Sequence, residues 1–109
     1  MNVSEMKNVL KGLESVTFSK HFQEEKVRLR GITEGEIKAH LNSPVKLIVM
    51  EDQGEEPEGH KYALLFSKSS KYDLKVVVSL KDKRLNVITA HIQNIKRRKV
   101  YEKWLRRRK

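Results

Sequence analysis

Two apolar runs rich in β-branched residues, at residues 75–80 and 85–90, constrain the fold of this chain more than any other feature. The four residues that separate them, 81–84, are all charged. A link this short joins neighbouring antiparallel strands, because parallel strands need a crossover of about a dozen residues or more. The sequence therefore predicts a β-hairpin that ends at His91 and leads into a segment rich in Lys and Arg.

Three helices are expected before residue 45, because apolar residues recur there at helical spacing after residues that favour helix N-termini. The first lies within residues 1–18, and its apolar face comprises Met6, Val9, Leu10 and Leu13. The second runs from Lys20 to about Arg30, and the third ends before Pro44. The expected N-caps are Ser4, Ser19 and Thr33, and Glu36 completes a capping box with Thr33.

From residue 45 the period of the apolar residues changes from that of a helix to that of a strand. Strands are expected at residues 45–50 and 62–67, joined by an acidic loop at residues 51–59, and the hairpin adds two more. The predicted fold class is α+β, with the N-terminal helices packed on a four-stranded antiparallel sheet and a basic C-terminal helix.

A chain of 109 residues is expected to form a single domain, residues 1–109. Residues 1–18 are expected to be a helical extension, and residues 95–109 a basic helix and tail capped by Asn94. The apolar stripe of this last helix comprises Val100, Tyr101, Trp104 and Leu105. We expect Trp104 to face the core, whereas Tyr101 fits either the core or a base-stacking surface.

Composition excludes several classes of function. The chain has no Cys, so disulfides and thiol chemistry are excluded. No apolar run is long enough to span a membrane and the N-terminus lacks the core of a signal peptide, so we expect a cytoplasmic protein without a membrane partner. Phosphate-binding and dinucleotide motifs are missing, and the four His show no ligand spacing. We therefore expect neither a cofactor nor a metal.

The formal net charge of +10 is concentrated at one end of the sequence. Residues 96–109 hold nine basic residues and one acid, whereas residues 51–58 hold five acids and no base. Such a basic segment favours a polyanion partner, most often a nucleic acid, although a solubilising tail has the same composition. The expected nucleic-acid-binding residues are Lys96, Arg97, Arg98, Lys99, Lys103, Arg106 and Arg107.

His91 and the bases that follow it have the chemistry of a metal-free RNA cleavage site. Such a site needs a base for the 2′-hydroxyl, cations for the charge on the phosphorus centre, and an acid for the leaving 5′-oxygen. His suits either proton-transfer role, and Arg supplies a permanently charged fork. The alternative is that His91 is a strand-end residue without a chemical role.

Two stretches resemble one known family. Residues 85–102, LNVITAHIQNIKRRKVYE, resemble the end of BrnT-type toxins, where a strand reading Ile-Ile-Ser-Ala-Arg leads into a basic helix that ends near a Tyr. Residues 20–44 are similar to the opening of RelE-related domains, with an Arg-Gly-Ile-Thr junction between two helices. Helices, then a meander, then basic residues is also the order of the RelE/ParE-like toxin superfamily. The resemblance covers about residues 19–102.

The resemblance implies a small endoribonuclease toxin that cleaves mRNA without a metal, free or on the ribosome, and is held by a cognate antitoxin protein. The candidate catalytic residues are His91, Arg97, Arg30, Tyr101 and His21. This sequence departs from the family pattern in two ways. The strand-end Arg is replaced by His91, and the His that begins the family's helix falls on Phe22 rather than His21.

Two rival functions remain open. One is a non-catalytic RNA- or DNA-binding protein that uses its basic C-terminal helix to contact phosphates. The other is a protein-interaction module for an acidic partner. For each of the three functions we allow for a homodimer.

Overall fold

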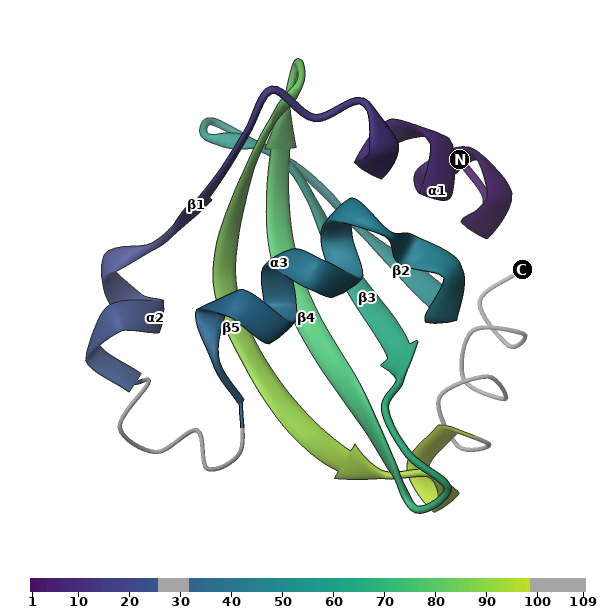
Figure 1. Cartoon of the computed structure of the whole chain (residues 1–109). Helices are drawn as coiled ribbons and strands as arrows, with labels where there is room; N and C mark the ends of the chain where they lie inside the picture. The colour runs from purple at the N-terminus through teal and green to yellow at the C-terminus, as the bar shows by residue number, and fades with distance from the viewer. Residues whose placement is uncertain (26–31, 99–109) are drawn as a thin grey trace.

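A five-stranded mixed sheet with helices packed against it forms the centre of the structure (Figure 1). The computed structural model describes residues 1–25 and 32–98. The strands are β1 (Ser15–Phe18), β2 (Leu47–Glu56), β3 (Gly59–Ser67), β4 (Tyr72–Lys81) and β5 (Arg84–Asn94), in the spatial order β1-β5-β4-β3-β2. The helices are α1 (Val3–Lys11), α2 (Lys20–Glu25) and α3 (Glu34–Asn42), followed by a 3-10 turn, η2 (Pro44–Lys46). The expected α+β class is confirmed.

The predicted hairpin is present as β4 and β5, and both strands are longer than expected. Leu80 pairs with Leu85 beside the turn, and Tyr72 pairs with Asn94 at the other end. Asp82 in the turn has φ +56°, a conformation that Asp adopts more readily than most residues. The extra length carries polar side chains on one face, which is why the apolar runs alone underestimated these strands.

The prediction of four antiparallel strands was wrong, because β1 adds a fifth strand that runs parallel to β5. Val16 pairs with Leu85 and Phe18 with Val87. Four residues are too few for an alternating pattern to be distinctive, and the pairing joins segments about 70 residues apart in sequence. Residues 1–18, expected to be a helical extension, therefore contain both α1 and β1.

The acidic segment is mainly strand rather than loop. Residues 51–56 belong to β2, and only Pro57 and Glu58 separate β2 from β3. The register shifts between Asp52 and Gly54, which has φ +95° and marks a β-bulge. Acids and glycine resembled a turn in the sequence, but a bulged strand accommodates them.

Helix starts were predicted in part. Asn2, not Ser4, caps α1, since its Oδ1 accepts from Glu5 N at 2.8 Å. Thr33 caps α3 as expected, whereas the Glu36 carboxylate forms an ion pair with Lys68. Residues 26–31, which include the expected end of α2 and Arg30, lie outside the described residues.

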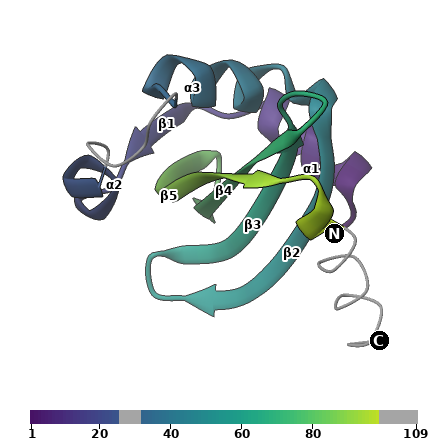
Figure 2. The same ribbon diagram turned by 90° about the horizontal axis from the view of Figure 1, so that it is seen from below.

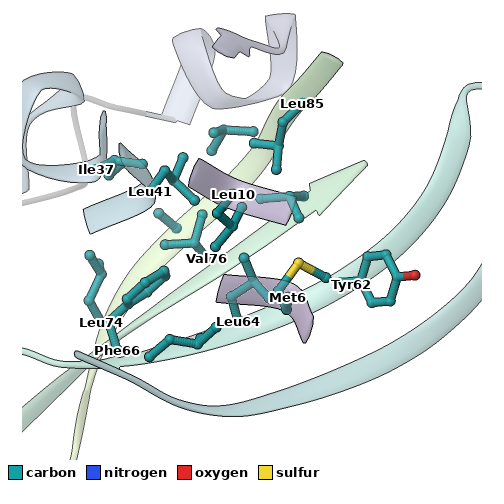
Figure 3. Packing of buried hydrophobic residues seen from close by; sticks show 14 of the residues in the cluster. Met6, Leu10, Ile37, Leu41, Tyr62, Leu64, Phe66, Leu74, Val76 and Leu85 are labelled. Carbon is teal, nitrogen blue, oxygen red and sulfur yellow. The ribbon is translucent and has the colours of Figure 1, made fainter. Parts of the chain in front are cut away.

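Helices α1 and α3 cover one face of the sheet, and the core lies between these helices and the sheet (Figure 2). Figure 3 shows Leu10 of α1 on the side of Leu41 of α3, and Met6 of α1 on the side of Tyr62 of β3. The side chains of Met6, Leu10, Ile37 and Leu41 are at most 1% exposed. Strand β4 contributes Leu74, Val76 and Val78 to this core; we call this side the first face. The alternate residues of β4, including Asp73, Lys75 and Val77, lie on the opposite side, the second face. Within the described residues, no helix is long and apolar enough to cross a membrane.

We predict that Leu10→Ala lowers the free energy of unfolding by about 2–5 kcal/mol, because it removes a buried side chain through which α1 packs in the core. The control is Val45→Ala, since Val45 is 71% exposed and should change stability by less than about 0.5 kcal/mol. Urea unfolding followed by circular dichroism measures both. Equal, small effects would mean that α1 is a dispensable extension.

Candidate nucleic-acid interface

His91 lies on β5 directly opposite Lys75 of β4. Lys75 alternates with the core residues Leu74 and Val76, so its side chain and that of His91 share the second face of the sheet. His91 is exposed and Lys75 is half-buried. A titratable imidazole and an ammonium group therefore stand side by side on adjacent strands.

A β-bulge in β5 puts His91 on this face. Val78 pairs with Val87 but Val77 pairs with Thr89, so Ile88 is an extra residue in β5. An extra residue exchanges the two faces of the strand beyond it, because side chains alternate with a period of two. Without the bulge, His91 would point to the first face with the core.

Ser19 holds the bulge in place. Its Oγ donates to the carbonyl of Ile88 at 3.0 Å, and its N–H donates to the carbonyl of Val87 at 2.8 Å. The same Oγ accepts from Phe22 N at 3.0 Å and so caps α2, as expected from the sequence. One side chain thus links the start of α2 to the residue that sets the orientation of His91.

A short basic turn follows β5 at residues 95–98. Asn94 Oδ1 accepts from Lys96 N at 2.9 Å, as expected of a helix cap, and residues 96–98 are helical. Ile95 N donates to the carbonyl of Lys71 at 3.0 Å, which brings the β3–β4 loop against the turn. We call Lys71, Lys75, His91, Lys96 and Arg97 together the basic end.

The charges of the basic end act on His91. Partial desolvation lowers the pKa of its imidazole below the ordinary value of 6.5, and the cations of Lys75 and Arg97 lower this pKa further. A neutral imidazole at pH 7 can accept a proton, which is the role of a general base. The neighbouring cations are suited to contacting phosphate oxygens.

Arg98 has a different role from its neighbours. Its Nε donates to Asp73 Oδ2 at 3.0 Å and its Nη2 to Asp73 Oδ1 at 2.5 Å. Asp73 is fully buried, at 0% exposed. Because this guanidinium already has a buried carboxylate partner, Arg98 adds less charge to the surface than Lys96 or Arg97.

Of the remaining predicted site residues, the structure describes only His21, which is not part of the basic end. His21 lies on α2 with its side chain 57% exposed, and its Nε2 is 3.8 Å from Glu25 Oε1. Phe22, where the family pattern would place a His, is buried in the core. Arg30, Lys99, Tyr101, Lys103, Arg106 and Arg107 lie outside the described residues.

Lys71 and Lys75 were missed in the sequence. Simple pairing outward from the turn, Leu80 with Leu85, would place Ala90 opposite Lys75. The bulge shifts this register by one residue, and nothing in residues 85–91 marks its position. Lys71 joins the basic end through a main-chain hydrogen bond to Ile95. Such a bond does not depend on the side chains, so the amino-acid sequence does not indicate it.

A second charged cluster lies on β2 and β3. His60 Nε2 is 2.5 Å from Asp52 Oδ1 and His60 Nδ1 is 3.1 Å from Glu55 Oε1, while the ring stacks on Tyr62. Hydrogen bonds to both carboxylates raise the pKa of His60, because they need an N–H on each ring nitrogen. His60 pairs with Leu80, beside the β4–β5 turn, so this cluster and the basic end lie at opposite ends of β4.

No group of three or more His, Cys, Asp or Glu that could hold a metal ion occurs in residues 1–25 and 32–98. Comparison of this chain with protein-family models, with curated proteins and with solved structures found no match. The resemblance to RelE/ParE-like toxins therefore remains a hypothesis from the sequence.

We predict opposite pKa shifts for two histidines, above 6.5 for His60 and below 6.5 for His91. The stability that imidazolium at His60 provides is complete below the unfolded-state pKa and is lost as pH rises through the raised folded-state pKa. The stability linked to neutral His91 is present above the unfolded-state pKa and is lost as pH falls through the lowered one. NMR titration of the ring protons measures both.

The variants His60→Gln and His91→Gln assign the two resonances and serve as mutual controls. Each should remove one titration and leave the other in place. The reverse order of the two pKa values would contradict the hydrogen bonds and charges described above.

Proposed function

We propose that this chain binds RNA at its basic end and cleaves it without a metal, with His91 as the general base. The observation that carries this proposal is the position of the His91 imidazole, on the second face opposite Lys75, where the charges of Lys75 and Arg97 both act on it. A base with a lowered pKa beside fixed positive charge suits proton abstraction next to a phosphate.

In the proposed reaction, the imidazole of His91 takes the proton of a ribose 2′-hydroxyl. The 2′-oxygen attacks the adjacent phosphorus, the bond to the 5′-oxygen breaks, and a 2′,3′-cyclic phosphate forms. Lys75 and Arg97 stabilise the charge on the non-bridging oxygens. The leaving 5′-oxygen takes its proton from a second acid, for which the sequence offers Tyr101.

The resemblance to RelE/ParE-like domains gives this reaction a biological setting. In that setting the chain is a toxin acting on mRNA in the cytoplasm, free or on the ribosome. A cognate antitoxin would cover the basic end, and acidic side chains would complement its charge. A homodimer stays compatible with this proposal.

Non-catalytic RNA binding is the second candidate, and the positions of the other histidines favour it. His21 pairs with Glu25 on α2, His40 packs against Phe66, and His60 lies near the β4–β5 turn. None of these three side chains belongs to the basic end, so a second imidazole cannot serve there as the acid. The cations would then bind phosphates without catalysis.

We predict that purified protein cleaves labelled RNA in excess EDTA and that His91→Ala lowers the rate by about 10²–10⁴-fold, the usual contribution of a general base. His60→Ala is the matched control, because it removes a histidine on the same sheet but outside the basic end. Arg97→Ala should weaken both binding and cleavage. Denaturing gels measure the rates and filter binding measures the affinity.

The outcomes separate the candidate functions. Cleavage that resists EDTA and requires His91 supports the enzyme. Binding that weakens steeply with salt, without cleavage, supports the second candidate. A protein that neither binds nor cleaves RNA would refute both and leave docking to an acidic protein.

A further inference from the structure

We propose that Asp73 is a positioning residue, which holds the basic turn against the sheet through Arg98 and so fixes the place of Arg97 at the basic end. This inference rests on the proposed function for its effect on RNA, whereas its structural part can be tested without RNA. Asp73 thereby has a role at the basic end although it is an acid. On electrostatic grounds alone, an acid is not expected at a surface that binds phosphates.

The burial of Asp73 is the first argument. Asp73 is fully buried on β4, between Ser67 of β3 and Gln93 of β5 in the register of the sheet. A buried carboxylate is costly unless its charge and its lone pairs are satisfied. Arg98 satisfies both oxygens at once, through Nε and Nη2.

The geometry of the ion pair is the second argument. Two donors of one planar guanidinium bind two oxygens of one carboxylate, which fixes orientation as well as distance. Lys carries a single ammonium group and cannot reproduce this contact. The Asp73–Arg98 ion pair therefore fixes the orientation of the basic turn on the sheet, in addition to holding the turn close to the sheet.

The third argument is how Arg98 is connected to the rest of the basic end. Arg98 N donates to the carbonyl of Ile95 at 3.0 Å, and Ile95 N donates to the carbonyl of Lys71. Asn94 closes the start of the turn through Lys96 N. Arg97 lies within this closed turn next to the anchored residue, and its charge reaches His91.

Positioning and simple electrostatics predict opposite results when Asp73 loses its charge. Asp73→Asn raises the net charge by one, so long-range attraction alone would tighten RNA binding. If Asp73 positions the turn, the substitution breaks the paired contact of Arg98 with two carboxylate oxygens, and Arg97 and Lys96 lose their fixed places. RNA binding then weakens even though the protein becomes more basic.

The test compares Asp73→Asn with Asp82→Asn in the full-length protein. Asp82 is exposed in the β4–β5 turn, at the far end of the same strand, and its φ of +56° suits Asn. Both variants make the same chemical change and add the same charge. Circular dichroism and thermal unfolding establish that each variant is folded.

We expect Asp73→Asn to weaken RNA binding and to make the slope of log affinity against log salt shallower by about one to two units, the contribution of one to two phosphate contacts. Asp82→Asn should bind as tightly as the unchanged protein or slightly more tightly. Without RNA, displacement of Arg97 by Asp73→Asn should move the pKa of His91 back toward its ordinary value, whereas loss of the Asp73 charge alone would lower this pKa further and would count against positioning. Asp82→Asn should leave the pKa of His91 unchanged.

The readouts distinguish failure of this inference from failure of the proposed function. If Asp73→Asn behaves as Asp82→Asn does in both RNA binding and the His91 titration, the positioning role is overturned. If the unchanged protein does not bind RNA, the proposed function fails and the His91 titration alone decides the role of Asp73.

A second variant keeps the test decisive if Asp73→Asn does not fold. Arg98→Lys preserves the charge but removes the fork, so positioning predicts the same shift of the His91 titration and the same loss of RNA affinity. An Arg98→Lys protein that matches the unchanged protein in both measurements would overturn the inference.

Discussion

The extra residue in β5, Ile88, is the constraint on which the candidate site depends. It exchanges the two faces of the strand, so Leu85 and Val87 face the core before it and His91 faces away from the core after it. Ser19 stabilises this exchange by binding the Ile88 carbonyl while it caps α2. The apolar contacts of the core and the polar groups of the second face are therefore set by the same irregularity. A straight strand would bury His91 or expose part of the core.

Positive and negative side chains gather at opposite ends of the strands of the sheet. The basic end lies where β4 begins and β5 finishes, and the His60 cluster with Asp52 and Glu55 lies near the β4–β5 turn. Each cluster combines one histidine with charges of a single sign, so the pKa values of the two histidines shift in opposite directions. We call strands β2 and β3 the acidic hairpin. Its carboxylates stabilise the imidazolium of His60, away from the cations at residues 95–98.

The α+β class, the β4–β5 hairpin and the caps at Ser19, Thr33 and Asn94 followed from local signals in the sequence, since turns and caps are encoded by a few adjacent residues. Strand β1 and the bulge at Ile88 were not predictable, because both depend on pairing between distant segments. For the same reason Lys75 and Asp73 were missed, since each joins the basic end only through pairing between distant segments. His91 and Arg97 were selected from the adjacent charge run, and their roles stay predictions. The catalytic role considered for His21 stays a prediction. In α2 the exposed His21 stands directly before the buried Phe22, so the position at which the family pattern has a His packs in the core.

The most direct test of the central claim, that the basic end binds RNA, is to map the contact by NMR. Titrating a short single-stranded RNA into ¹⁵N-labelled protein should perturb the backbone amides of residues 71–75 and 91–97, with saturation at low salt and reversal at high salt. Residues 52–60 and helix α1 should remain unchanged, because they lie away from the basic end. Perturbations centred on α1, α3 or the acidic hairpin, or none at any salt concentration, would contradict the account.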